Sequence, residues 1–136
     1  MHDALRRYAR YLLGTFFLFA GFSHLFWARE DFRAQVPGWV PLDVDLVVVA
    51  SGVVEIGLGV ALFLAIRRRV MVGWVVAAFL VAVFPGNIAQ YTSGTDAFGL
   101  DTDRARLTRL FFQPVLVLWA LWCTGAFPRR SPVQGR

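Results

Sequence analysis

The chain has 136 residues, of which 57% are hydrophobic and 15% aromatic, and its formal net charge is +5. This length fits one domain, and the 17% of charged residues falls below the roughly 25% usual in soluble domains. All fourteen basic residues are arginines that stand between apolar runs, which argues against a nucleic-acid-binding face and favours the loops of a membrane protein. Cys123 is the single cysteine, so a disulfide framework or a CxxC redox pair within one chain is excluded.

The first predicted membrane helix covers about residues 8–28. Arg6, Arg7 and Arg10 lie at its start, and the apolar run that follows is long enough to cross the roughly 30 Å hydrocarbon core. A cleaved signal peptide is the alternative interpretation. It is disfavoured because the apolar run is too long and its end lacks the small residues of a cleavage site.

A loop is predicted over residues 29–45, because Pro37 and Pro41 disfavour a continuous helix there. Trp39, between these prolines, suits the level of the lipid headgroups. The second helix is predicted over about residues 45–66. It stops at three consecutive arginines, residues 67–69, and this tight turn predicts that the second and third helices are antiparallel neighbours.

The third and fourth helices are predicted over about residues 70–91 and 104–127, followed by a loose tail from residue 128. The segment Asp101–Asp103 resembles a helix N-cap, with acidic groups at the positive end of the helix dipole. The expected fold class is therefore all-α: a single domain, residues 1–136, that forms a four-transmembrane-helix bundle. Arginines gather in the N-terminus, the 67–69 turn and the tail, so both termini are expected on the cytoplasmic side of the cell (plasma or inner) membrane, as in a multi-pass protein.

Each predicted helix contributes a polar side chain to the outer half of the bilayer. Glu55 carries the only charge between residues 46 and 66, and an intramembrane carboxylate is by default a functional hypothesis. At about 1.5 Å per residue, His24 lies about 6 Å and Glu55 about 15 Å inside the outer boundary. Asn87 and Gln113 lie near the outer ends of their helices. Polar groups that face lipid are unsatisfied, so all four should point into the bundle and meet.

Backbone-breaking residues lie at the same depth. Pro85 is expected to kink the third helix, whereas Pro114 either kinks the fourth helix or marks its first turn. Gly52 and Gly59 share a helix face with Glu55, so a neighbouring helix can approach the carboxylate closely. Together these features predict a ligand-binding pocket.

The chemistry of this pocket is expected to be binding. His24 and Glu55 can form a proton-sharing pair that hydrogen-bonds the carbonyl of a quinone or another lipophilic ligand. One imidazole, one carboxylate and two carboxamides do not make the usual set for zinc or copper, so no metal site is predicted. No nucleophile or nucleotide motif supports a catalytic residue, and enzymatic activity stays open. In the purely structural alternative, His24 is interfacial and the two amides each contribute about 1 kcal/mol as interhelical contacts.

Five segments in this order give the chain a resemblance to the DoxX-like family of small four-helix membrane proteins: Gly21–Phe26, Val36–Pro41, Ser51–Gly57, Phe84–Ile88 and Arg109–Pro114. On this resemblance His24, Glu55, Asn87 and Gln113 correspond to recurring polar positions of the family. The family is named for quinone-linked sulfur oxidation, and its wider relatives include proteins similar to assembly chaperones or cargo receptors.

Two functions of different classes are therefore expected. The first is an accessory subunit of a redox system that holds a lipophilic ligand, with quinone as the candidate cofactor, in an outer-leaflet pocket. The alternative is a non-catalytic assembly factor or chaperone for a membrane-protein partner. The expected partners are the lipid bilayer and either a membrane protein or a second copy of the chain, and no nucleic acid.

Overall fold

The computed structural model describes residues 2–27, 29–33, 36–93 and 102–127, and within these ranges it contains helices and no strand. The predicted all-α class is confirmed. The five helices are α1 (His2–Phe26), α2 (Arg29–Arg33), α3 (Val44–Leu64), α4 (Arg69–Ser93) and α5 (Asp103–Thr124). The predicted tail from residue 128 lies outside the described residues.

Three of the described helices are long and apolar enough to cross a membrane. These spans are Val44–Leu64 of α3, Arg69–Thr92 of α4 and Leu107–Thr124 of α5. Helix α1 was predicted as a fourth span but is not among them. Its apolar stretch is shortened by Arg10 near one end and by Ser23 and His24 near the other.

The observed helix ends differ from the predicted ones where a helix continues beyond its apolar run into polar residues. Helix α1 begins at His2, because the polar residues before its apolar run continue the helix. Thr102 is the N-cap of α5, inside the segment predicted as a cap, and its hydroxyl accepts from the Ala105 N–H at 3.1 Å. Pro114 lies well inside α5, so it does not mark the first turn. Gly125 ends α5 in the left-handed region, with φ 77°.

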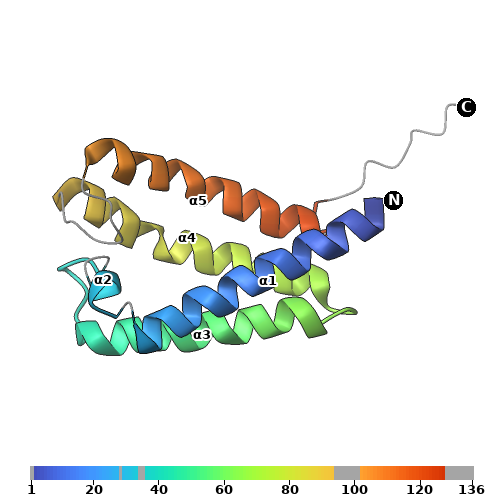
Figure 1. The fold of residues 1–136 in the computed structure, drawn as a ribbon, viewed down its shortest axis with the longest axis horizontal. Helices are drawn as coiled ribbons and strands as arrows, with labels where there is room; N and C mark the ends of the chain where they lie inside the picture. Colours follow the sequence, from blue (N-terminus) through green and yellow to red (C-terminus); the bar gives the residue numbers. More distant parts are fainter. Residues whose placement is uncertain (1, 28, 34–35, 94–101, 128–136) are drawn as a thin grey trace, which may run out of the picture.

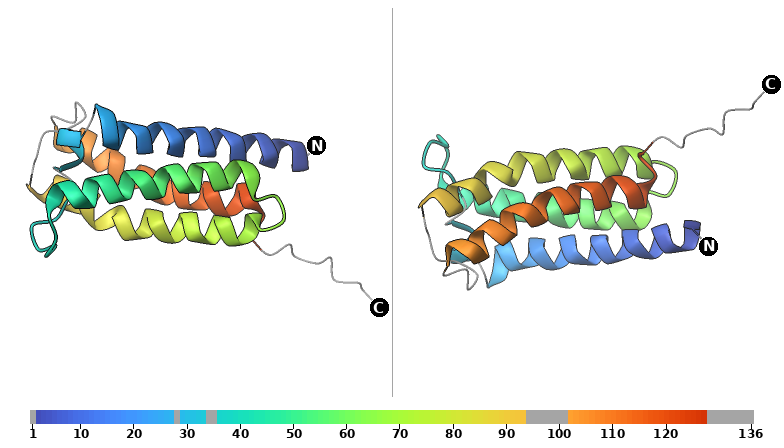
Figure 2. Two further views of the ribbon diagram at one scale, coloured as in Figure 1. Left: turned by 90° about the horizontal axis from the view of Figure 1, so that it is seen from below. Right: turned by 90° about the horizontal axis from the view of Figure 1, so that it is seen from above.

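The four long helices form two antiparallel pairs, α1 with α3 and α4 with α5 (Figures 1 and 2). Contacts within each pair are much more extensive than contacts between the pairs. The turn at residues 65–68 makes α3 and α4 antiparallel, as predicted, but they touch only sparsely. The main partner of α3 is α1. We call the end of the bundle that holds this turn the turn end, and the opposite end, which holds α2, the loop end.

Glycines bring α1 and α3 together at two levels. Gly14 faces Gly59, and Gly21 faces Gly52 about two helical turns further along. A Cβ atom added to Gly21 would lie 2.7 Å from the carbonyl oxygen of Gly52, closer than real contacts allow. Small residues at such positions let helix backbones approach in a membrane. The glycine stripe predicted on α3 therefore has a matching stripe on α1.

The turn end is the tightly packed half of the bundle. It holds a cluster of buried apolar side chains from all four long helices: Leu13, Phe17, Leu58, Leu62, Val72, Val76, Leu80, Leu116, Ala120 and Cys123. Two side chains join the helices there. Arg10 is buried and donates to the Leu62 carbonyl at 2.8 Å, and the Trp119 indole donates to the Ala9 carbonyl at 3.1 Å. The positive charge of Arg10 thus lies at the negative end of the α3 dipole, where the carbonyls of the last turn have no donor within the helix.

At the loop end, α1 stops before α3 does, and α2 lies in the corner that this leaves (Figure 1). Residues 29–45 were predicted as a loop, which missed this short helix. Asp45, in the first turn of α3, holds it in place. Its carboxylate is 3.6 Å from Arg29 and 3.3 Å from Arg33.

Candidate functional site

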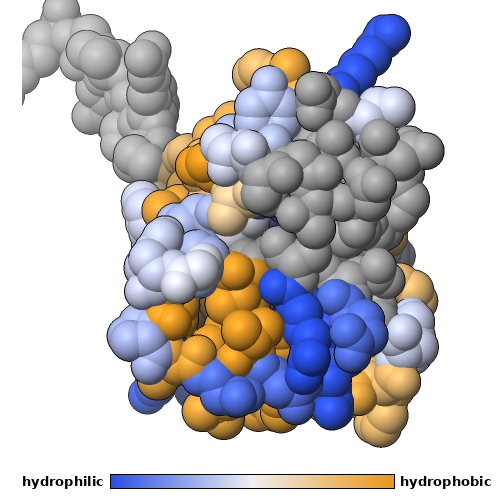
Figure 3. All heavy atoms as spheres, turned by 90° about the vertical axis from the view of Figure 1, so that its left-hand side faces the viewer, coloured by the Kyte–Doolittle hydropathy of each residue, from blue (hydrophilic) through white to orange (hydrophobic). Residues whose placement is uncertain are grey.

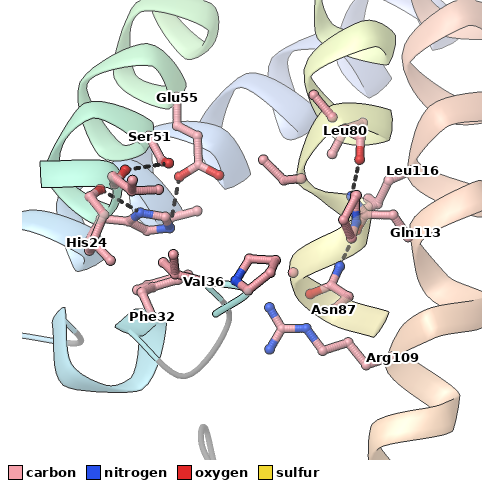
Figure 4. Close-up of a pocket in the computed structure, with 18 of the residues that line it drawn as sticks. His24, Phe32, Val36, Ser51, Glu55, Leu80, Asn87, Arg109, Gln113 and Leu116 are labelled. Atoms are coloured by element: carbon pink, nitrogen blue, oxygen red, sulfur yellow. Dashed lines mark hydrogen bonds and ion pairs between the residues drawn. The ribbon is translucent and has the colours of Figure 1, made fainter. Parts of the chain in front are cut away.

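A cavity of about 610 Å³ lies between the two helix pairs toward the loop end. All four long helices, α2 and residues 36–40 line it, and most of the lining side chains are apolar. Phe17, Leu80 and Leu116 of the buried cluster form its floor. Its volume falls within the range of roughly 300–1,000 Å³ typical of pockets for small molecules. Figure 4 shows the polar side chains on its walls.

His24 and Glu55 form one polar group on the wall made by α1 and α3. The imidazole Nε2 is 3.2 Å from Glu55 Oε2, and both side chains are largely buried, with 8% and 14% of their surface exposed. The other ring nitrogen, Nδ1, is 3.2 Å from the Val48 carbonyl oxygen. The ring of Phe32 packs on the imidazole, with 3.3 Å between ring centroids. The imidazole is thus held by α3 on two sides and by α2 on a third.

Gly52 makes this arrangement possible. A Cβ atom at this position would lie 2.8 Å from the Cβ of His24 and 3.0 Å from the carbonyl oxygen of Gly21. Any larger residue would push α1 away from α3 at the level of the imidazole. Gly52 therefore positions His24 for its contact with Glu55.

Hydrogen-bond chemistry fixes one proton between His24 and Glu55. A carbonyl oxygen only accepts, so the contact with Val48 requires a proton on Nδ1. Glu55 Oε2 is buried and makes no hydrogen bond to another group of the described chain. Its 3.2 Å contact with Nε2 is favourable only with a proton between the two atoms. Either an imidazolium faces a carboxylate, or a neutral imidazole accepts from a carboxylic acid.

Asn87 and Gln113 form a second polar group, on the wall made by α4 and α5. Asn87 Nδ2 donates to Gln113 Oε1 at 3.3 Å, and Gln113 Nε2 donates to the Leu80 carbonyl oxygen at 2.8 Å. Both side chains are buried. The carboxamide of Gln113 is therefore used at both ends to join the two helices.

The structure places all four predicted residues on the wall of one cavity, but as two separate pairs on facing walls (Figure 4). The predicted depths of His24 and Glu55 differed because each was measured from the end of its own helix. They are wrong as relative depths, since α3 extends beyond α1 and the two side chains are in contact. Whether these four residues bind a ligand stays a prediction.

The sequence-based interpretation missed Arg109 and Ser51. Arg109, near the start of the predicted fourth helix, lines the cavity, and its guanidinium points inward from α5 (Figure 4). Its charge acts on Glu55 of the facing wall. A signal was present: Arg109 precedes Gln113 by four residues, and Ser51 precedes Glu55 by four, so each pair shares a helix face.

The loop end of the molecule is amphipathic. Hydrophobic and strongly hydrophilic side chains are exposed side by side there (Figure 3). Val36, Pro37, Trp39 and Val40 line the cavity from this side, and Trp39 is 75% exposed. An exposed indole at the end of apolar helices is typical of a membrane–water interface.

Comparison with curated proteins and with solved structures gave no significant match. The family model named domain of unknown function DUF8561 matches residues 13–124, from the middle of α1 to the last residue of α5. The match covers most of the chain, which therefore belongs to the DUF8561 family.

Proposed function

We propose that the chain is an integral membrane protein in which α1 is the fourth transmembrane helix. Helix α1 packs against α3 from the Arg10–Leu62 contact to the His24–Val48 contact. These contacts are about 21 Å apart along each helix at 1.5 Å per residue. Because α3 is long and apolar enough to cross the membrane, a helix that follows it over this length crosses the same region.

The expected topology has the turn end in the cytoplasm of a cell whose plasma or inner membrane holds the protein. The start of α1, the turn at residues 65–68 and the end of α5 lie together at this end (Figure 1). The arginines at positions 6, 7 and 67–69 are concentrated there, and arginine-rich loops favour the cytoplasmic side. The cavity then lies toward the outer leaflet.

The proposed function is the binding of a lipophilic ligand in this cavity. One observation carries it: a cavity of about 610 Å³ in a small bundle has mostly apolar walls and a buried His24–Glu55 pair on one of them. Filling such a volume with side chains would normally stabilise the fold, so a cavity with mostly apolar walls and a few polar groups is typical of a binding site.

A quinone is the ligand that we propose, with the protein as an accessory subunit of a redox system. The residues present fit its chemistry: apolar side chains would hold the ring and tail, and the donors of Arg109 offer hydrogen bonds to ring oxygens. When bound, a quinone supplies electron and proton transfer. The resemblance of residues 21–26, 51–57 and 109–114 to DoxX-like proteins adds support to this proposal.

The test is the ligand content of the purified protein. Wild type, Ala20→Phe and Ala50→Phe are purified in mild detergent, and the extracted lipids are compared by mass spectrometry. Ala20 lines the cavity, whereas Ala50 lies on the exposed side of α3. We expect a quinone to copurify with wild type and Ala50→Phe, and at least about ten-fold less with Ala20→Phe, because the ring would occupy part of the cavity. Absence of any lipophilic ligand from all three folded proteins would refute the proposal.

A second candidate is a non-catalytic assembly factor for a membrane-protein partner. The observation that favours it is that both ends of the Gln113 carboxamide bond within the chain, to Asn87 and to the Leu80 carbonyl, as in a purely structural contact. On this alternative the cavity variants carry no ligand. A client membrane protein would then lose abundance when the gene is deleted and regain it with Ala20→Phe.

A further inference from the structure

The wall of the cavity made by α1 and α3 offers hydrogen-bond acceptors. Ser51 Oγ donates its single proton to the Val47 carbonyl oxygen at 2.7 Å, so only its lone pairs are left for the cavity. One carboxyl oxygen of Glu55 faces the imidazole, and the other, Oε1, points into the cavity (Figure 4). Ser51 and Glu55 lie one helical turn apart, so both acceptors are on the same face of α3.

The acceptor character of Glu55 Oε1 does not depend on where the shared proton resides. If His24 is an imidazolium, Glu55 is a carboxylate and Oε1 carries no proton. If His24 is neutral, the proton resides on Oε2, because Nε2 must accept from it. In both states Oε1 can only accept, so a ligand must bring its own donor to this wall.

The facing wall has the opposite character near Arg109. A guanidinium carries five N–H donors and no acceptor, and that of Arg109 points into the cavity. The side chain is half-buried in α5, a position at which a ligand oxygen can reach it. A complementary ligand therefore donates at the α3 wall and accepts at the α5 wall.

We propose that the pocket prefers the quinol, the hydroxyl-bearing reduced form, over the quinone; this inference rests on the proposed function. The ring oxygens of a quinone only accept, so a quinone leaves Glu55 Oε1 without a partner. A quinol donates one hydroxyl proton to Oε1, and its other ring oxygens accept from Arg109. A site built around a hydrogen-bonding group rejects an analogue that lacks this group, because its buried polar atoms are left unpaired.

The experiment compares decylubiquinol with decylubiquinone, which share the same ring substituents and tail. Binding to the purified full chain in detergent micelles is measured by isothermal titration calorimetry under argon. We expect the dissociation constant of the quinol to be at least about ten-fold lower. The quinol dimethyl ether, which has no donor, is expected to bind as weakly as the quinone.

Variants at position 55 separate a donor preference from a general effect of shape. In Glu55→Gln, the amide nitrogen can donate to His24 Nε2 while the amide oxygen still faces the cavity, so the quinol remains the preferred ligand. Glu55→Met removes the acceptor and is expected to bring the two dissociation constants within about three-fold of each other. Ser23→Ala is the matched control. Ser23 is a buried α1 residue that bonds within its own helix and does not line the cavity.

The outcomes distinguish this inference from the proposed function. Binding of the quinol and the quinone with equal affinity, or tighter binding of the quinone, overturns the preference and leaves the proposed function intact. Failure of wild type to bind either molecule refutes both. If Glu55→Met does not fold, the wild-type comparison and the dimethyl ether still decide the question.

Discussion

At the scale of single residues, His24 and Glu55 depend on each other. Among the described residues, neither buried group has a second partner for the atom it presents to the other: the Val48 carbonyl contacts only Nδ1, and Oε2 contacts only Nε2. A buried polar atom that loses its partner costs free energy because it has already given up water. The contact is therefore expected to matter for folding as well as for binding.

This dependence predicts different effects for two substitutions of Glu55. Glu55→Leu leaves His24 Nε2 buried without a partner and is expected to lower the free energy of unfolding by about 1–3 kcal/mol. Glu55→Gln, whose amide can donate to Nε2, is expected to lower it by less than about 1 kcal/mol. Thermal unfolding in detergent measures the difference. Equal melting temperatures for the two variants would contradict a hydrogen-bonded pair at this position.

The contact of His24 with Glu55 was predicted from the sequence, whereas the separation of Asn87 and Gln113 into a second pair on the facing wall was not. Polarity at membrane depth identified Glu55 and Gln113. Which residue each one meets depends on which helices are neighbours and on how far each extends. Arg109 was not predicted as a cavity residue for a second reason. An arginine near a helix end is expected at the level of the lipid headgroups, and only the neighbouring side chains show that it lines a cavity.

At the scale of helices, the α1–α3 pair depends on glycines in an identifiable way. Gly52 contacts α1 so closely that a Cβ would lie 2.8 Å from His24 Cβ, whereas a Cβ at Gly57 would meet nothing within 4 Å. The two glycines are on the same helix and differ in which side of α3 they occupy. They offer a matched test of helix approach.

We expect Gly52→Ala to destabilise the protein by about 1–3 kcal/mol, because the added methyl group must displace α1. Gly57→Ala is expected to be neutral or to stabilise by up to about 1 kcal/mol, because alanine favours a helix over glycine. Unfolding monitored by circular dichroism in detergent with increasing sodium dodecyl sulfate compares the two. A Gly52→Ala protein as stable as Gly57→Ala would show that the close approach is not needed.

The helices could largely be predicted from the sequence, since the long apolar runs on either side of the three arginines at residues 67–69 define α3 and α4 within a few residues. The missed α2 and the early start of α1 have a common cause. Both involve polar, charged segments, for which apolar run length carries no information. Whether such a segment is helical depends on local capping and on contacts such as those of Asp45 with Arg29 and Arg33.

At the scale of the whole molecule, the side of the membrane on which the start of the chain lies depends on whether α1 crosses. If α1 crosses the membrane, Leu5 lies on the same side as Arg68 and opposite to Trp39. If α1 lies on the surface instead, Leu5 is on the side of Trp39. Leu5 and Trp39 are exposed. Cys123, the native cysteine, is buried and can be replaced by alanine to give a background for labelling.

We expect a membrane-impermeant maleimide to label Trp39→Cys on intact cells, and to label Leu5→Cys and Arg68→Cys only after lysis, all in the Cys123→Ala background. Labelling of Leu5→Cys together with Trp39→Cys, while Arg68→Cys stays protected, would mean that α1 does not cross. Labelling of Leu5→Cys and Arg68→Cys but not of Trp39→Cys on intact cells would invert the orientation that the arginines predict.

The sparse contact between the two helix pairs has a mechanical consequence. Each pair is closely packed within itself, and Trp119 of α5, whose indole donates to the Ala9 carbonyl of α1, joins the two pairs at the turn end. A small rotation of one helix pair about the turn end would change the width of the cavity toward the loop end and leave the packing within each pair unchanged. A ligand in the cavity would hold the two pairs apart, so the size of the ligand would set the angle between them.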